Sequence, residues 1–214
     1  MPVECYGATR PRDGRQPAQN QDAFLIVREP MVSAAVCDGD GNAQQAARRV
    51  TSLVETQLRE LTLGQMLGGD PWHDWVRLLD SALFEAAEST LVGLSIVGAE
   101  ARGIAVGDSR VYLFPADGGC VLLTEDAPKA RLGSGEAVGL PIRQHLAHRD
   151  VLVLLSDGAW TPLSPWRLDR TVRSSALGHF SDVPQLILDL AAEHGRSDDM
   201  TAVTVRFLAH AVGR

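Results

Sequence analysis

Short apolar segments separated by turn residues dominate the sequence and have the length of β-strands. Two of them lie between residues 20 and 40, and from residue 90 onward they recur with glycine and proline at their boundaries. Apolar runs of this length between turn residues favour strands. We therefore predict strands at Ala23–Val27, Val32–Cys37, Thr90–Val97, Ala101–Val106, Arg110–Phe114, Val121–Thr124, Val151–Leu155 and Met200–Leu208.

Three segments instead show the spacing of amphipathic helices. Apolar residues at three- and four-residue intervals predict helices over Ala43–Leu63, from Pro71 through Ala86, and over Val183–His194. Pro71 suits the first turn of a helix, and Gly195 is a suitable C-terminal cap. The segment Leu163–His179 shows no pattern from which an element is predicted.

The order of these elements indicates the fold class. Strands, two long helices, many strands, one helix and a last strand do not alternate as a doubly wound parallel sheet requires. The order favours an α+β fold, a β-sandwich of two antiparallel sheets flanked by α-helices. Neither an internal repeat nor a linker divides the 214 residues, so we predict a single domain over 1–214.

Composition and charge narrow the range of partners. The net charge of −7 and the single lysine, Lys129, argue against binding to nucleic acid or to an anionic membrane. Apolar runs are too short for a transmembrane helix, and the N-terminus does not resemble a secretory signal. The three cysteines, Cys5, Cys37 and Cys120, fit neither a disulfide framework nor a zinc site. We therefore expect a cytoplasmic monomer in a reducing environment.

Aspartates stand where apolar runs begin or end. A single aspartate at such a position is explained by a turn, but here there are five, at Asp22, Asp38, Asp108, Asp157 and Asp198. If the fold brings them together, their repulsion and burial become tolerable when hard divalent cations lie between them. Oxygen ligands without nearby histidines favour Mg²⁺ or Mn²⁺ over zinc. Such cations would also attract an anionic substrate to an acidic chain.

Several short motifs around these aspartates occur in a familiar order. They are Asn20-Gln21-Asp22-Ala23, Val36-Cys37-Asp38-Gly39-Asp40-Gly41, Thr90-Leu91, Val106-Gly107-Asp108-Ser109-Arg110-Val111-Tyr112, Leu155-Ser156-Asp157-Gly158-Ala159-Trp160 and Ser197-Asp198-Asp199-Met200-Thr201. In this order, over residues 20 to 208, the sequence resembles the metal-dependent protein phosphatases, the protein phosphatase 2C-like family.

The resemblance implies a cleft between the two sheets that holds two Mn²⁺ or Mg²⁺ ions. Asp38 would bridge both ions, and the Gly39 carbonyl would bind one of them. Asp157 and Asp198 would bind the other ion, and Asp22 would act through bound water. Asp108 matches a position that contributes to a third, weaker ion site.

The sequence departs from the family pattern at four positions. Gln21 replaces a frequent glutamate, and Pro17 replaces the arginine that usually binds the substrate phosphate, which leaves Arg12 and Arg15 as candidates. Asp40 stands where some members have histidine as the proposed general acid, so it is the candidate catalytic acid beside Asp38. Thr161 stands where many members have an aspartate, which makes a complete third ion site doubtful.

The resemblance implies hydrolysis of phosphoserine and phosphothreonine monoesters in proteins. A hydroxide bridging two divalent ions would attack phosphorus directly, without a phosphoenzyme. The expected partners are phosphoproteins, as in a bacterial enzyme that opposes a Ser/Thr kinase. Two alternatives remain open: a catalytically weak or inactive pseudo-phosphatase that binds phosphoproteins, and an enzyme that hydrolyses a small phosphorylated metabolite.

Overall fold

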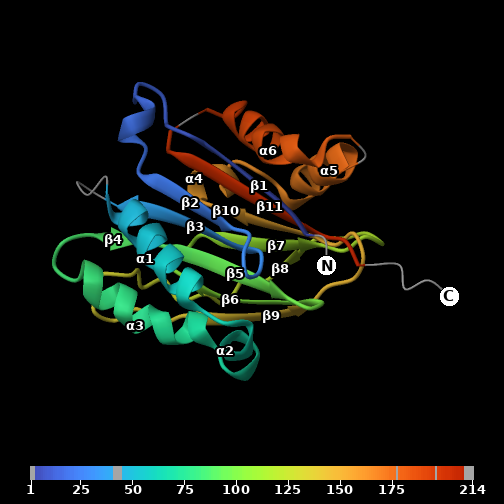
Figure 1. Ribbon diagram of the computed structural model, residues 1–214. Helices are drawn as coiled ribbons and strands as arrows, with labels where there is room; N and C mark the ends of the chain where they lie inside the picture. The colour runs from blue at the N-terminus through green and yellow to red at the C-terminus, as the bar shows by residue number, and fades with distance from the viewer. Residues whose placement is uncertain (1–2, 41–44, 177, 196, 210–214) are drawn as a thin grey trace.

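Two antiparallel sheets pack face to face, with helices on both outer surfaces (Figure 1). The computed structural model describes residues 3–40, 45–176, 178–195 and 197–209. The predicted fold class is therefore confirmed. Within the described residues, no helix has the length and apolar character needed to cross a membrane.

The first sheet has the strand order β1-β11-β10-β7-β8. The strand pair at one edge of this sheet joins residues 3–10 to residues 200–207, because β1 pairs with β11 over eight positions. The strands are β1 (Val3–Arg10), β7 (Arg110–Phe114), β8 (Val121–Leu122), β10 (Val151–Leu155) and β11 (Met200–Phe207).

The second sheet has the order β2-β3-β5-β6-β9, and a two-residue strand, β4, pairs with the end of β3. Its first two strands form a hairpin in which every partner pair is antiparallel. The strands are β2 (Asp22–Val27), β3 (Ser33–Asp40), β4 (Glu88–Ser89), β5 (Leu91–Val97), β6 (Glu100–Val106) and β9 (Leu140–His145).

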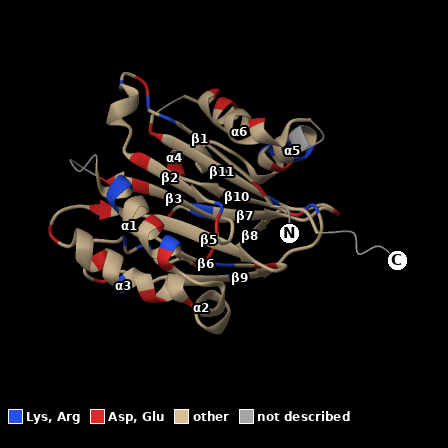
Figure 2. Ribbon diagram, in the orientation of Figure 1, with Lys and Arg blue, Asp and Glu red and all other residues tan. Residues whose placement is uncertain are grey.

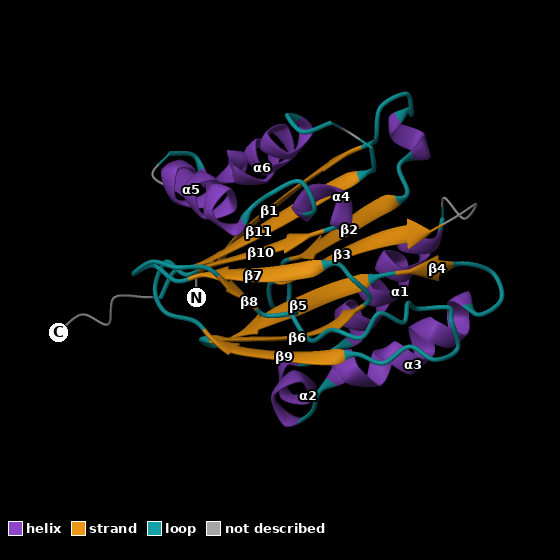
Figure 3. Ribbon diagram, turned by 180° about the vertical axis from the view of Figure 1, so that it is seen from behind, coloured by secondary structure: helices purple, strands orange, loops and turns teal. Residues whose placement is uncertain are grey.

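The helices form two separate outer layers, seen from behind in Figure 3. The second sheet is covered by α1 (Ala46–Glu60), α2 (Leu63–Gly68) and α3 (Pro71–Leu83). The first sheet is covered by α4 (Asp157–Trp160), α5 (Pro165–Ala176) and α6 (Val183–Ala192). Two short 3-10 helices, η1 (Pro17–Gln19) and η2 (Phe180–Asp182), complete the elements.

Three apolar layers hold the fold together. The middle layer lies between the sheets and includes residues such as Val36, Leu94 and Leu154. The helix-facing layers bury the periodic positions of α1, such as Val50 and Val54, and of α6. Burial of these side chains removes apolar surface from water, which is the main favourable contribution to folding.

Several elements differ from the sequence-based predictions. The predicted helix over Ala43–Leu63 is described from Ala46 to Glu60, and residues 43 and 44 lie outside the described part of the chain. The helix over Val183–His194 ends at Ala192, and the one from Pro71 ends at Leu83. The segment without a prediction, Leu163–His179, contains α5.

The strands β1 and β9 and the short helix α2 were not predicted. β9 contains Pro141 and is the last strand of its sheet, a position where proline is tolerated. α2 is only six residues long and contains two glycines, so it shows little helical periodicity. Its one local signal is a capping box between Thr62 and Gln65.

Candidate active site

The β2–β3 hairpin places two of the predicted aspartates side by side. Asp22 opens β2 and is the register partner of Asp38 near the end of β3. Acidic segments lie next to each other at these strand ends in Figure 2. Only 4% of Asp22 and 13% of the Asp38 side chain are exposed, so both carboxylates are largely removed from water.

The first sheet brings Asp157 and Asp198 to the same place. Leu155 at the end of β10 pairs with Ala202 of β11, so the segments that follow β10 and precede β11 meet. Asp157 then begins α4, and Asp198 lies two residues before β11. Gly158 permits this approach, because a Cβ atom at that position would lie 2.1 Å from the backbone oxygen of Asp199.

Ser156 links the two sheets at this point. Its buried hydroxyl donates a hydrogen bond to Asp22 Oδ2 (2.6 Å) and accepts one from the backbone N–H of Thr201 (2.9 Å). The backbone of Asp38 is held in a similar way, because its N–H donates to Thr90 Oγ1 (3.0 Å) and its carbonyl accepts from Ser89 Oγ (3.1 Å). Hydrogen bonds therefore fix the Asp22 carboxylate and the backbone that carries the Asp38 carboxylate.

The electrostatics of the site show that the aspartates have converged. Burial raises the pKa of Asp22 from 3.8 to about 7. Hydrogen bonds from Ser156 and Thr201 oppose this rise without cancelling it. Burial and the neighbouring charges of Asp22 and Asp157 raise the pKa of Asp38 to about 9. The pKa of Asp157 is also raised, by burial first and then by Asp198 and Asp108. Buried like charges shift carboxyl pKa values in this direction.

The convergence leaves one buried atom unsatisfied. Among the described residues, Asp22 Oδ1 is buried and has no hydrogen-bond partner. A buried, unpaired carboxylate oxygen is costly, and a hard cation is the partner that oxygen-rich sites take. The chemistry of this donor set therefore fits Mg²⁺ or Mn²⁺. Within the described ranges, no group of three or more Asp, Glu, His or Cys side chains is already arranged around a common point as ion ligands.

An arginine lies among the exposed members of the cluster. Arg131 Nη2 is 3.4 Å from Asp108 Oδ2 and 3.8 Å from Asp38 Oδ2, and Arg131 Nη1 is 3.7 Å from Asp40 Oδ2. Burial alone would lower the pKa of Arg131, but Asp108, Asp38 and Asp40 together raise it. Asp40 and Asp108 are thus drawn toward a guanidinium group, and Gly39 lies between Asp38 and Asp40 in β3.

The two candidate phosphate-binding arginines lie in the loop before β2. Arg15 is 3.1 Å from Asp199 Oδ2 and donates to Gln21 Oε1 (2.6 Å). The backbone N–H groups of Arg12 and Gln21 also donate to the Asp199 carboxylate, at 2.7 and 2.8 Å. Asp199, which is 1% exposed, therefore organises the loop. The guanidinium of Arg15 is engaged, whereas Arg12 is anchored through its backbone.

Two cavities adjoin members of the acidic cluster. One of about 630 Å³ is lined by Asp108, Lys129 and Trp160, and the Arg110 guanidinium lies 3.3 Å from the centre of the Trp160 ring. Another, of about 400 Å³, is lined by Asp40 and Glu88. Both offer room for groups attached to a molecule bound at the aspartates.

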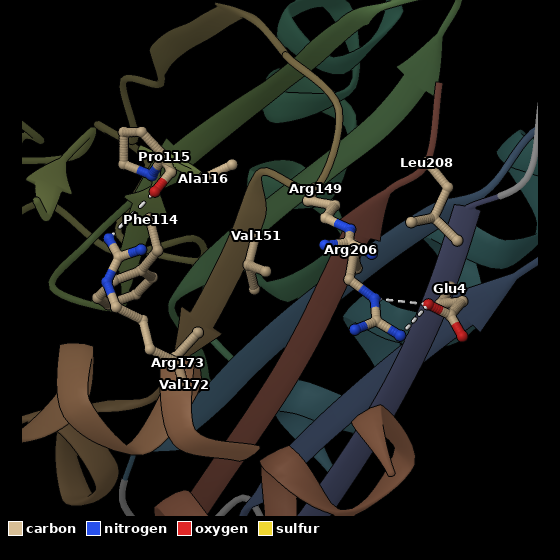
Figure 4. A pocket seen from close by; sticks show the side chains of 10 residues that line it. All are labelled: Glu4, Phe114, Pro115, Ala116, Arg149, Val151, Val172, Arg173, Arg206 and Leu208. Carbon is tan, nitrogen blue, oxygen red and sulfur yellow. Dashed lines mark hydrogen bonds and ion pairs between the residues drawn. The ribbon is translucent and has the colours of Figure 1, made fainter. Parts of the chain in front are cut away.

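A slightly larger cavity, of about 670 Å³, lies at the opposite end of the first sheet (Figure 4). Two of its cations are already paired: Arg206 with Glu4, and Arg173 with the carbonyl of Pro115. Its apolar wall carries no cluster of acid, base or nucleophile. We therefore place the candidate chemistry at the aspartates and not in the larger cavity.

Solved structures share this architecture. Stp1, a serine/threonine phosphatase from Staphylococcus aureus, matches with a TM-score of 0.87 and 17% identity, over 98% of this chain and 96% of that one. The catalytic domain of PstP, in complex with two manganese ions, matches with a TM-score of 0.80 and 18% identity, over 97% and 99%. The S. agalactiae serine/threonine phosphatase matches with a TM-score of 0.82 and 18% identity, over 97% and 100%.

This chain has the fold of the bacterial serine/threonine phosphatases. No protein-family model and no curated protein matches the sequence. The structural likeness extends over nearly the whole chain at 17–18% identity.

Three residues of the site were not singled out from the sequence. Ser156 and Asp199 lie next to Asp157 and Asp198, the predicted metal ligands. Arg131 had no motif, because it lies before a glycine-rich loop whose path the sequence does not reveal. Arg131 is held in place by the next residue, Leu132, which is buried and pairs with Ser89, and no sequence pattern indicates this contact.

Proposed function

We propose that this protein is a metal-dependent phosphatase that hydrolyses phosphoserine and phosphothreonine monoesters in proteins. The observation that carries the proposal is the convergence of buried aspartates around the unsatisfied Asp22 Oδ1. The fold supports it, because Stp1 and PstP are serine/threonine phosphatases of the same architecture. PstP was solved with two manganese ions, which supports a requirement for two Mn²⁺ or Mg²⁺ ions here.

The proposal assigns the ion-binding residues as follows. Asp38 would hold both ions, the Gly39 carbonyl would bind one of them, Asp157 and Asp198 would bind the other, and Asp22 would act through bound water. When bound, such a pair of ions supplies a water nucleophile near neutral pH and offsets the charge of the phosphoryl oxygens. Asp108 is the position at which the family resemblance implies a third, weaker ion.

Other residues of the site position these ligands or are candidates for proton transfer and phosphate binding. Ser156 orients Asp22, and Thr90 holds the backbone of Asp38. Asp40 ends β3 with its side chain 66% exposed, and it is the candidate general acid, a role in which its carboxyl group must carry a proton. Arg12 is the better candidate for the substrate phosphate, because Asp199 and Gln21 engage Arg15.

Hydrolysis of an aryl phosphate with Mn²⁺, and again with excess chelator, tests the proposal. We expect turnover only with the metal. Asp38→Ala should reduce it by more than about a hundredfold, since even the outer partners of metal ligands are worth about 10–100-fold. Asp126→Ala, which removes an exposed aspartate outside the cluster, should leave it unchanged. Metal-independent turnover, or an active Asp38→Ala variant, would refute the assignment.

The substrate class needs a second comparison. A phosphoserine or phosphothreonine peptide should be hydrolysed faster than nucleotides, and the reverse order would indicate a small-metabolite phosphatase. The engagement of Arg15 by Asp199 favours one other function, a pseudo-phosphatase that binds phosphoproteins without turnover. Tight phosphopeptide binding with no Mn²⁺-dependent hydrolysis would identify it. A cognate Ser/Thr kinase is the expected opposing enzyme.

A further inference from the structure

Arg131 lies where the acidic cluster meets solvent. Its guanidinium faces carboxylates from three separate segments: Asp38 and Asp40 of β3, and Asp108 of the turn before β7. Both Asp108 oxygens are 3.4 Å from Nη2. Within the described part of the chain, no other arginine or lysine forms an ion pair with these three aspartates.

The backbone holds Arg131 in this place. The next residue, Leu132, is fully buried and exchanges two hydrogen bonds with Ser89, at 3.0 and 2.9 Å. Gly133 has a φ of +96°, and its N–H donates to the buried Asp80 carboxylate (2.6 Å). A Cβ atom at Gly133 would lie 2.0 Å from the Ala87 carbonyl oxygen, so the loop passes directly against its neighbour. Arg131 is therefore presented by a fixed segment.

A guanidinium so placed competes with a metal ion. It remains charged at any pH at which the protein is folded, and it repels a divalent cation that approaches the same carboxylates. It uses the oxygens of Asp108 and Asp40 that a further ion would need. Asp22 and Asp157 lie outside its ion pairs, and its contact with Asp38 Oδ2, at 3.8 Å, is the longest of the three, so these deeper aspartates stay available to cations.

We propose that Arg131 is a built-in cation that takes the place of a third divalent ion on the Asp40–Asp108 side of the cluster. The inference rests on the proposed metal-dependent function and refines it, since the protein would then work with two ions. Arg131 is a positioning residue in this role. It sets the charge and the placement of Asp40 and Asp108 without itself binding metal.

The test is a count of bound Mn²⁺ by equilibrium dialysis and elemental analysis. Arg131→Gln should bind one ion more than the wild-type protein, and Arg131→Lys, which keeps the charge, should bind the wild-type number. Arg110→Gln is the matched control: it removes a nearby arginine that stacks on Trp160 and forms no ion pair with the cluster. It should also bind the wild-type number.

Two variants locate the additional ion. Adding Asp108→Asn to Arg131→Gln should remove the extra ion, whereas Asp108→Asn alone should lose none. This second variant keeps the test valid even if Arg131→Gln does not fold. An unchanged ion count in folded Arg131→Gln, or loss of an ion in Asp108→Asn alone, overturns the proposal. Failure of the proposed function would look different, because the wild-type protein would then either bind no Mn²⁺ or bind it without hydrolysing the aryl phosphate.

Discussion

Removal of the Ser156 hydroxyl should destabilise the metal-free protein in a pH-dependent way. The hydroxyl donates to Asp22 Oδ2 and accepts from the Thr201 N–H, and both contacts are buried. The pKa of Asp22 in the folded protein is about 7, raised from 3.8 by burial. The carboxyl is therefore neutral at pH 5 and charged at pH 9. The Ser156→Ala variant loses a neutral hydrogen bond at the lower pH and a charge-assisted one at the higher pH.

The two cases differ in magnitude. A neutral hydrogen bond contributes about 0.5–1.5 kcal/mol and one to a charged group about 1.5–3 kcal/mol, with a further cost for the orphaned Thr201 N–H. We expect Ser156→Ala to lower the free energy of unfolding by about 1–2 kcal/mol at pH 5 and by about 2–4 kcal/mol at pH 9. Urea unfolding with chelator present, at both pH values, measures the difference.

Ser95→Ala provides the matched control. Ser95 is also fully buried and also has two hydrogen bonds, with Ser33 Oγ (2.7 Å) and from Trp72 Nε1 (3.1 Å), and neither partner is a carboxylate. Its loss should cost the same at both pH values. A Ser156→Ala cost that is equal at pH 5 and pH 9, or greater at pH 5, would refute the reasoning about Asp22.

Two further predictions concern the unmodified site and the core. The pKa of Asp22 is raised to about 7 and that of Asp38 to about 9. Without metal, the folded protein therefore keeps protons on these groups that the unfolded protein loses near pH 4. The free energy of unfolding in chelator should accordingly fall from pH 4 to pH 9. Mn²⁺ at a hundred times its Kd should restore about 2.7 kcal/mol at pH 9, and thermal unfolding with no pH dependence and no metal effect would contradict this. Gly93→Ala places a methyl group 2.3 Å from the Trp72 ring and should cost about 1–3 kcal/mol in urea unfolding. Gly68→Ala is the control, because a Cβ atom at Gly68 meets no atom within 4 Å, and it should lower the free energy of unfolding by much less. Equal losses in the two variants would contradict the prediction that a side chain at Gly93 clashes with Trp72.

Local patterns in the sequence determined the fold class and most of its elements. Apolar runs predicted β7 and β10 with the correct ends. These strands are buried on both faces, so nearly all of their residues are apolar. The turn-flanked aspartates could also be recognised individually, since each stands next to such a run. The elements that the sequence did not predict are stabilised by contacts with segments distant in the sequence. β1 exists because all eight of its residues pair with β11, nearly 200 positions away.

Only the tertiary structure decided which charged groups meet. The antiparallel pairing of β2 with β3, and of β10 with β11, sets Asp22 and Asp38 beside Asp157. No local pattern contains the Ser89–Leu132 contact that holds Arg131 beside those aspartates, because it joins segments more than forty residues apart. A carboxylate acquires its raised pKa from burial and from neighbours in space, and the order of residues along the chain specifies neither until the sheets have packed.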